Sequence, residues 1–248
     1  MSEEIAISLA GLPIDIALHY QEAGIYFRHW LRQDVGCGIR VSASDDDIQA
    51  ELARYPAGAH PGNAELTALV YRLSDRLLPL KKVFFHGLAI LFKGKAWIFT
   101  GPSGVGKTTQ YRLLKKRHGA DIDLICGDRP ILEAAADGKI VVHPTPWNGK
   151  ENMRSCMKHA TLGGIVCLKQ ETSNSISVMP HRESVLYLFR QMLFLPNCRE
   201  NVLLAGEILS AVVKSAPVWF LANKGDEASA ELAFQALKEN ADALQNRS

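Results

Sequence analysis

The sequence predicts an α/β protein in two parts, a small α+β N-terminal domain over residues 1–80 and a larger α/β domain over residues 81–248. Short apolar runs and segments of helical periodicity follow one another throughout the second part. Charge divides at the same point, because residues 1–80 carry a net −5 with no lysine and residues 81–248 carry +7. A positive second part is compatible with anion binding, and equally with two surfaces of different charge.

The first part predicts a few short elements. Apolar residues alternate over 3–18, which indicates a strand or hairpin, and 39–42 fits a short strand. Ser44 precedes three aspartates, and this predicts a helix start, because acidic groups favour the positive end of a helix. That helix is expected to end by Pro56, and apolar residues at helical spacing over 64–78 predict a longer helix.

The second part predicts a series of short strands bounded by glycine, lysine or aspartate. The expected strands are 83–86, 89–92, 96–100, 124–126, 131–134, 140–143, 164–169, 175–179 and 218–221. The expected helices are 108–117, 181–195, 200–214 and a last one from about residue 227. Asp137-Gly138 predicts a hairpin turn between two of the strands.

The composition narrows the classes of function. A net charge of +2 argues against bulk nucleic-acid binding. No stretch approaches 18 consecutive apolar residues and the acidic start does not resemble a secretory signal, so we expect a cytoplasmic protein without a membrane segment. Five cysteines without a C-x-x-C pair indicate free thiols rather than a disulfide framework or a zinc site.

The stretch Gly-Pro-Ser-Gly-Val-Gly-Lys-Thr at 101–108 fits the phosphate-loop pattern G-x-x-x-x-G-K-[ST] between an expected strand and an expected helix. Glycines let backbone N–H groups approach phosphate oxygens, Lys107 supplies a charge for the β- and γ-phosphates, and the Thr108 hydroxyl suits Mg²⁺. The alternative is a glycine-rich turn with an idle lysine. ATP and Mg²⁺ are therefore the expected cofactors, although GTP stays open. The predicted nucleotide-binding residues are Ser103, Gly104, Val105, Gly106, Lys107, Thr108 and Thr109.

Two residues outside the loop are candidates for catalysis. Asp128 follows a short apolar strand and could hold Mg²⁺ together with Thr108, or accept a proton from an attacking hydroxyl. The alternative is a turn aspartate beside Arg129. His86 ends an upstream strand and could contact the γ-phosphate or the attacking group, or be a histidine with a structural partner.

The segment His-Pro-Thr-Pro-Trp-Asn-Gly-Lys at 143–150 has an unusual composition. Its prolines fix the backbone, Trp147 offers a flat apolar face and Lys150 a cation, so the segment could line the substrate or base side of a pocket. The alternative is a rigid surface loop with a packed tryptophan.

The order of these motifs resembles the HPr kinase-like group of P-loop proteins, which is related to the phosphoenolpyruvate carboxykinases. The resemblance spans about 83–221, with F-F-H-G, G-P-S-G-V-G-K-T-T, I-C-G-D-R-P-I-L and P-T-P-W-N-G-K in that order. It implies a mixed β-sheet around the loop and ATP-dependent phosphoryl transfer to a serine-type hydroxyl of a peptide, protein or small molecule. On this resemblance Lys107 clamps the phosphates, Thr108 and Asp128 serve the metal, and Asp128 or His86 assists the hydroxyl. It also implies a possible homo-oligomer.

The chain departs from the group's pattern in two places. Gly127-Asp128 stands where the group commonly has two adjacent acids, and Thr108-Thr109 where HPr kinases have Ser-Glu. These departures argue against HPr itself as the acceptor, and the short chain argues against a carboxykinase-type lyase. The missing acid favours the alternative function, a nucleotide-binding regulatory or interaction module without phosphoryl transfer.

Overall fold

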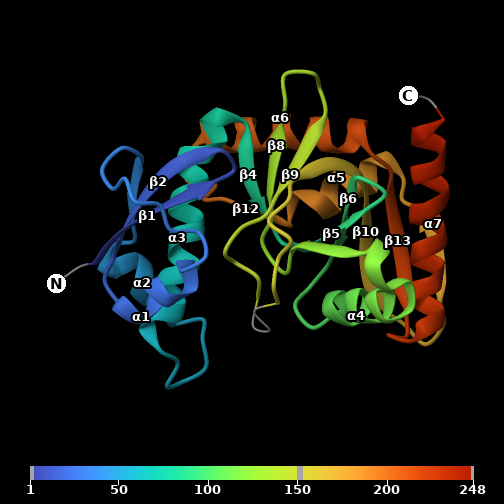
Figure 1. Cartoon of the computed structure of the whole chain (residues 1–248), viewed down its shortest axis with the longest axis horizontal. Helices are drawn as coiled ribbons and strands as arrows, with labels where there is room; N and C mark the ends of the chain where they lie inside the picture. Colours follow the sequence, from blue (N-terminus) through green and yellow to red (C-terminus); the bar gives the residue numbers. More distant parts are fainter. Residues whose placement is uncertain (1–2, 150–152, 247–248) are drawn as a thin grey trace.

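The computed structural model of the chain describes residues 3–149 and 153–246, and its strands form a three-stranded sheet and a ten-stranded mixed sheet (Figure 1). Figure 1 shows the small sheet at the left with α1, α2 and α3, and the large sheet at the centre with α6 above it. The two ends of the chain lie on opposite sides of the molecule in that view. The predicted α/β class with a small N-terminal sheet is therefore confirmed.

The N-terminal elements follow the expected pattern. In chain order they are β1 (Glu3–Leu9), β2 (Leu12–Leu18), α1 (Gln21–Gly24), the 3₁₀ turn Ile25–Phe27, β3 (Ile39–Ser42), α2 (Asp45–Leu52), α3 (Pro61–Leu77) and the 3₁₀ turn Leu78–Leu80. β1 and β2 form the expected antiparallel hairpin, and β3 pairs in parallel with β2. Ser44 caps α2 by accepting a hydrogen bond from the Asp47 amide, while the Asp47 carboxylate accepts from the Ser44 amide.

The large sheet combines parallel and antiparallel pairs. Its elements are β4 (Lys82–Phe85), β5 (Gly87–Phe92), β6 (Lys95–Thr100), α4 (Lys107–His118), the 3₁₀ turn Gly119–Asp121, β7 (Asp123–Cys126), β8 (Ile131–Ala134), β9 (Ile140–His143), β10 (Ala160–Gln170), β11 (Ser175–Val178), α5 (His181–Phe189), β12 (Met192–Leu193), α6 (Arg199–Ser215), β13 (Val218–Asn223) and α7 (Glu227–Gln245). The order is β12-β4-β8-β9-β10-β6-β5-β7, and β13 pairs with β10 and β11. β10 runs parallel to β6 and β13, which makes the sheet mixed.

Two bent ribbons carry the strands nearest to the predicted site. Residues 82–92 form β4 and β5 with His86 between them, and residues 123–134 form β7 and β8. β4 pairs with β8, and β5 pairs with β7. At the bends, the Phe85 amide donates to the Pro130 carbonyl at 2.9 Å and the Gly87 amide to the Asp128 carbonyl at 2.8 Å. The ribbons thus stay paired across the bends, which brings His86 next to Asp128.

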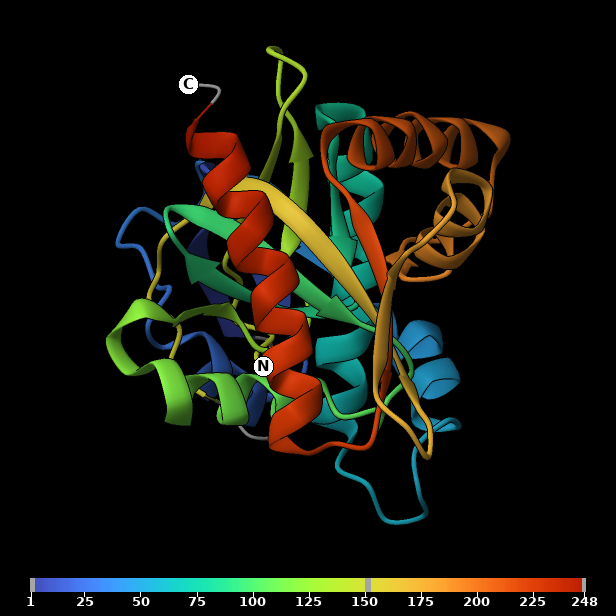
Figure 2. The same cartoon turned by 90° about the vertical axis from the view of Figure 1, so that its right-hand side faces the viewer.

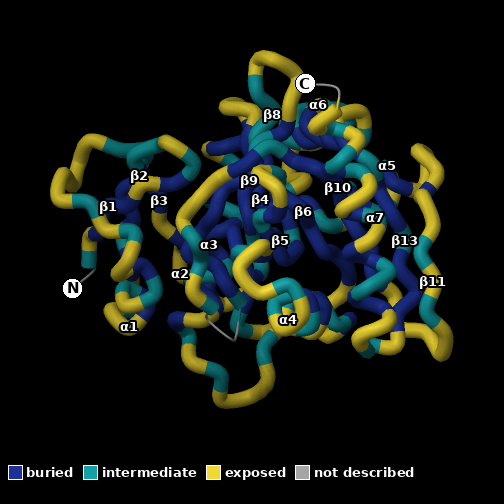
Figure 3. Tube along the Cα trace, turned by 45° about the vertical axis from the view of Figure 1, so that its right-hand side comes forward, coloured by how far each residue is buried: buried dark blue, intermediate teal, exposed yellow. Residues whose placement is uncertain are grey.

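Helices cover both faces of the large sheet. Figure 2 shows α7 crossing one face beside α4, with α5 and α6 together on the other side. One apolar cluster lies between the sheet and α5 and α6, and another between the sheet and α4 and α7. Figure 3 shows the central strands as buried and the outer turns as exposed.

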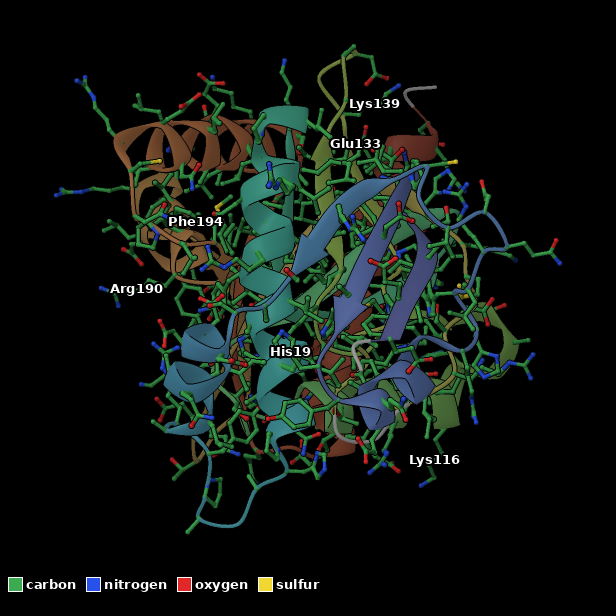
Figure 4. The ribbon with its side chains drawn as sticks, turned by 90° about the vertical axis from the view of Figure 1, so that its left-hand side faces the viewer. His19, Lys116, Glu133, Lys139, Arg190 and Phe194 are labelled. Carbon is green, nitrogen blue, oxygen red and sulfur yellow. The ribbon has the colours of Figure 1, made fainter. Side chains whose placement is uncertain are left out.

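A third apolar cluster joins the N-terminal elements to the large sheet. It contains the inward faces of β1, β2 and α3, and also Phe84, Ile131 and Trp147 from beyond residue 80. Figure 4 looks onto this side, with the N-terminal strands in front and α3 beside them. The predicted domain boundary at residue 80 therefore lies inside a continuous apolar contact.

One predicted element is wrong in part. The helix expected over 181–195 ends at Phe189, and Met192–Leu193 form the short strand β12. These two residues pair with Phe85 and Phe84 of β4, so an edge of the sheet competes with the helix for them. In the described part of the chain, no helix has the length and apolarity needed to cross a bilayer.

Candidate active site

The glycine-rich turn 101–106 connects β6 to α4, as the sequence predicted. Gly101, Gly104 and Gly106 have φ of 143°, 81° and 108°, values that side chains with a Cβ rarely adopt. The turn is closed by a 3.2 Å hydrogen bond from the Val105 amide to the Pro102 carbonyl. A sequence richer in β-branched residues could not follow this path.

The first turn of α4 stands at the end of this loop. Gly106 occupies the N-cap and has a left-handed backbone, and among the described residues no side chain caps the helix. The uncapped N–H groups carry the positive end of the helix dipole. Thr108 is half-buried and Thr109 is exposed in this turn, while Ser103 and Gly104 are exposed in the loop.

Lys107 points back over the loop. Its side chain is buried, with 8% of the residue exposed, and Nζ donates to the Gly101 carbonyl at 2.9 Å and the Pro102 carbonyl at 3.2 Å. Nζ also lies 3.3 Å from His86 Nε2. Burial lowers the pKa of the Lys107 ammonium, and the Asp128 carboxylate opposes that shift.

His86 is fixed by its backbone at the bend between β4 and β5. Its amide donates to the Gln191 carbonyl at 2.7 Å, and its carbonyl accepts from the Thr100 hydroxyl at 2.7 Å. Burial, followed by the Lys107 charge, lowers the pKa of the imidazole from its ordinary 6.5. The ring is therefore neutral at pH 7 and has a nitrogen lone pair available.

Asp128 faces both His86 and Arg129. Asp128 Oδ1 lies 3.6 Å from His86 Nε2, and Oδ2 lies 3.3 Å from Arg129 Nε. The side chains of His86 and Asp128 are 24% and 26% exposed, so each remains accessible from solvent. The structure thus brings three predicted residues, Lys107, His86 and Asp128, into one cluster.

Gly127 has no room for a side chain. A Cβ built at this position would lie 2.4 Å from the Asn148 carbonyl oxygen. The Gly127 amide also donates to Asn148 Oδ1 at 2.9 Å, and the Arg129 amide donates to the Trp147 carbonyl at 3.1 Å. Residues 146–149 therefore pack directly on 127–129, and a second acid at 127 would displace them.

Trp147 is a packed residue rather than an exposed face. It is 3% exposed, and its ring makes edge contacts with Phe27 and Phe84 at centroid distances of 5.4 and 5.3 Å. Its Nε1 donates to the Leu66 carbonyl at 2.8 Å. The packed alternative is therefore the correct one, and Lys150 of the same segment lies outside the described residues.

The comparisons with known proteins give little to add to this geometry. No family model matches the chain, and no curated protein matches it. Among solved structures, the chain is similar to the Hpr(Ser) kinase/phosphatase from Coxiella burnetii, with 10% identity and a TM-score of 0.26, over 53% of this chain and 91% of that chain. A similarity of this extent carries no argument for function, which has to come from the side chains.

A cavity of about 910 Å³ lies beside this cluster. Its walls come from residues 22–30, 60–66, 146–148 and 153–157, so both parts of the chain contribute. Tyr26 is one of the lining residues, and burial raises the pKa of its phenol to about 12, with smaller effects from the charges of Arg129 and Asp128. Tyr26 therefore lines the cavity and is close enough to Arg129 and Asp128 for their charges to affect its pKa.

Tyr26 was not among the predicted site residues. Its surroundings, an aromatic and apolar run without clear periodicity, hold no pattern that indicates a site. Its place depends on contact with residues about a hundred positions later in the chain. Only the structure could have found it.

The described residues offer a limited donor set for a metal. Within residues 3–149 and 153–246, no three His, Cys, Asp or Glu side chains are arranged to hold an ion. In the same ranges no hydrogen bond joins Thr108 to Asp128. A divalent ion here would therefore need ligands from a bound phosphate group as well as from these two side chains.

Proposed function

We propose that this chain is an ATP- and Mg²⁺-dependent phosphotransferase that passes the γ-phosphoryl group to a hydroxyl of a peptide, protein or small molecule. One observation carries the proposal. A lysine ammonium, a neutral imidazole and a carboxylate meet at the mouth of a glycine-rich turn that leads into an uncapped helix. These are the groups that phosphoryl transfer requires, because the reaction depends on positioning and on charge stabilisation.

The loop supports binding of a triphosphate. Its glycines expose backbone N–H groups, and α4 with its twelve residues adds the positive end of its dipole. Lys107 Nζ already lies over the loop, where it would face the β- and γ-phosphates. Mg²⁺ would be held by Thr108 and Asp128 together with phosphate oxygens and would neutralise charge on the phosphates.

His86 and Asp128 support activation of the acceptor. In the proposed step the acceptor oxygen forms a bond to the γ-phosphorus, and the bond from that phosphorus to the bridging oxygen of ADP breaks. The proton of the hydroxyl passes to the Asp128 carboxylate or to the imidazole of His86, whose lowered pKa leaves it neutral at pH 7. Arg129, which contacts Asp128 Oδ2, holds that carboxylate in place.

A second candidate function is a nucleotide-binding regulatory module without transfer. One observation favours it, the close packing of Gly127 against Asn148, which leaves Asp128 as the single acid at the bend. In that case ATP would change the conformation of the 146–149 segment and with it a partner surface.

The two functions are separated by Asp128→Asn in the full chain. With γ-labelled ATP, Mg²⁺ and a panel of free serine and serine peptides, a kinase should lose label transfer by about 10²–10⁴-fold. Its ATP affinity, measured by calorimetry, should change much less. Asp137→Asn, in the exposed β8–β9 turn, is the matched control and should leave transfer unchanged. Tight ATP binding with no transfer to any acceptor would favour the regulatory module.

A further inference from the structure

The cavity of about 910 Å³ is not explained by nucleotide binding. Its lining residues come from 22–30, 60–66, 146–148 and 153–157, and none comes from the 101–109 loop. Its lining is therefore separate from the proposed phosphate site. A volume of this size is at the upper end of ordinary ligand sites and exceeds what a single amino acid would fill.

The cavity is connected to Asp128 through its wall. Asn148 lines the cavity and at the same time accepts the Gly127 amide hydrogen bond at 2.9 Å. A Cβ built at Gly149 would lie 3.3 Å from Asp128 Cβ, so the backbone of Gly149 passes close to the aspartate. Tyr26 completes this boundary from the N-terminal side. A ligand in the cavity would thus contact a side chain that is bonded directly to the Gly127–Asp128 bend.

The charges in the cavity walls favour an anionic ligand. Arg28 and Arg154 line it with Glu22 as the opposing acid, and within the described residues neither arginine forms an ion pair. Two histidines also line it, but both accept hydrogen bonds. His29 Nε2 accepts from Arg28 Nε at 3.0 Å, and His60 Nδ1 accepts from the Gly62 amide at 3.1 Å.

Most of the remaining lining side chains are apolar or aromatic. Trp30, Leu66 and Met153 line the cavity with Tyr26, and Trp30 is partly exposed, whereas Trp97, Trp147 and Trp219 are buried. Aromatic walls with a few cations suit a short peptide. The peptide backbone and the apolar parts of its side chains can pack on the rings, while its carboxylates bind the guanidinium groups.

We propose that this cavity is the acceptor site and that its occupant is a short acidic peptide segment whose hydroxyl reaches Asp128. The inference rests on the proposed function and extends it from a hydroxyl acceptor to an acidic peptide. It also gives the N-terminal residues a role. Although residues 1–80 carry a net −5, they present Arg28 to the acceptor and supply most of the residues that line the cavity.

Transfer rates to matched peptides test the charge preference. The probes are acetylated heptapeptides with a central serine and one leucine, flanked by glutamates, glutamines or lysines, together with free serine. We expect label transfer from ATP to the glutamate peptide to be about tenfold faster than to the glutamine peptide, since two exposed arginines contribute. The lysine peptide should be slowest, and the double variant Arg28→Glu/Arg154→Glu should reverse the order. Arg182→Glu is the control, because Arg182 is an exposed residue of α5 that does not line the cavity. This variant should keep the order of transfer rates of the parent protein.

A binding measurement separates this inference from the proposed function. Trp30 is the lining tryptophan, so the glutamate peptide should change the fluorescence of the full chain without ATP, and Trp30→Phe should remove that change. Binding with the predicted charge order but no transfer would support the acceptor site and refute the kinase. If the rate of transfer does not depend on the flanking charge, or if free serine is phosphorylated as fast as the glutamate peptide, the acidic-peptide site is wrong. The proposed kinase activity would still hold.

Discussion

The contact between Gly127 and Asn148 can be tested by adding one methyl group at position 127. In Gly127→Ala the new Cβ would lie 2.4 Å from the Asn148 carbonyl oxygen, about 1 Å inside ordinary van der Waals contact. The atoms that the new Cβ would meet belong to the backbone of Asn148, so no side-chain rotation can relieve the overlap. Residues 146–149 must therefore move away from 127–129.

The size of the effect follows from what this movement disrupts. Overpacking in a closed site costs about 1–3 kcal/mol. The movement also stretches the hydrogen bonds from the Gly127 amide to Asn148 Oδ1 and from the Arg129 amide to the Trp147 carbonyl, each worth about 0.5–1.5 kcal/mol. We expect the free energy of unfolding to fall by about 2–4 kcal/mol, in the upper range for single substitutions.

Urea unfolding followed by tryptophan fluorescence measures this change. Gly206→Ala in α6 is the matched control, because a Cβ at 206 would meet nothing within 4 Å, and it should be neutral or stabilising by up to about 1 kcal/mol. Gly127→Asp, which would create two adjacent acids, should lower phosphoryl transfer rather than raise it. A Gly127→Ala protein as stable as the parent would refute the packing argument.

Three further predictions concern single residues. Lys107→Ala should weaken ATP binding by at least about tenfold in calorimetry, since Nζ is the cation nearest to the loop, and unchanged affinity would contradict the proposed phosphate site. Burial and the Lys107 charge lower the pKa of His86, so the unfolded chain takes up the proton first as the pH falls through about 6.5. The free energy of unfolding should therefore decrease from pH 7 to pH 5, and the decrease should be smaller in His86→Gln. If the free energy of unfolding fell equally with pH in the two proteins, the ring would not be buried and neutral. Trp147→Phe should cost about 1–2 kcal/mol in urea unfolding, because it leaves the Leu66 carbonyl without its indole donor, and a cost near zero would show that the bond contributes nothing.

Much of the secondary structure could be predicted because its signals are local. Ser44 and the three aspartates after it mark the start of α2, and Asp137-Gly138 marks the turn between β8 and β9. The glycine-rich turn and the helix after it were predicted for the same reason, since the required conformations restrict the residues within one short stretch. The domain division at residue 80 and the roles of the predicted site residues stay predictions.

The remaining features depend on contacts between distant parts of the chain. Gln191 lies inside the expected helix 181–195. Pairing with β4 makes the next two residues, Met192 and Leu193, a strand instead. Whether Trp147 faces a ligand or the core is decided by Phe27 and Phe84, which lie more than sixty positions earlier. The cavity at Tyr26 belongs to this class too, because its walls come from segments with no shared motif.

The paired bends at His86 and Asp128 have a consequence for motion. Both residues belong to ribbons whose amides are bonded across the bend, at Phe85 to Pro130 and at Gly87 to Asp128. His86 and Asp128 therefore lie on a frame that opens only when strand pairing is lost, and slow amide exchange should mark it. The phosphate loop and the 146–149 segment are attached to this frame at its edges. The backbone spacing between His86 and Asp128 should thus stay nearly constant while exposed loops around them move on a faster timescale.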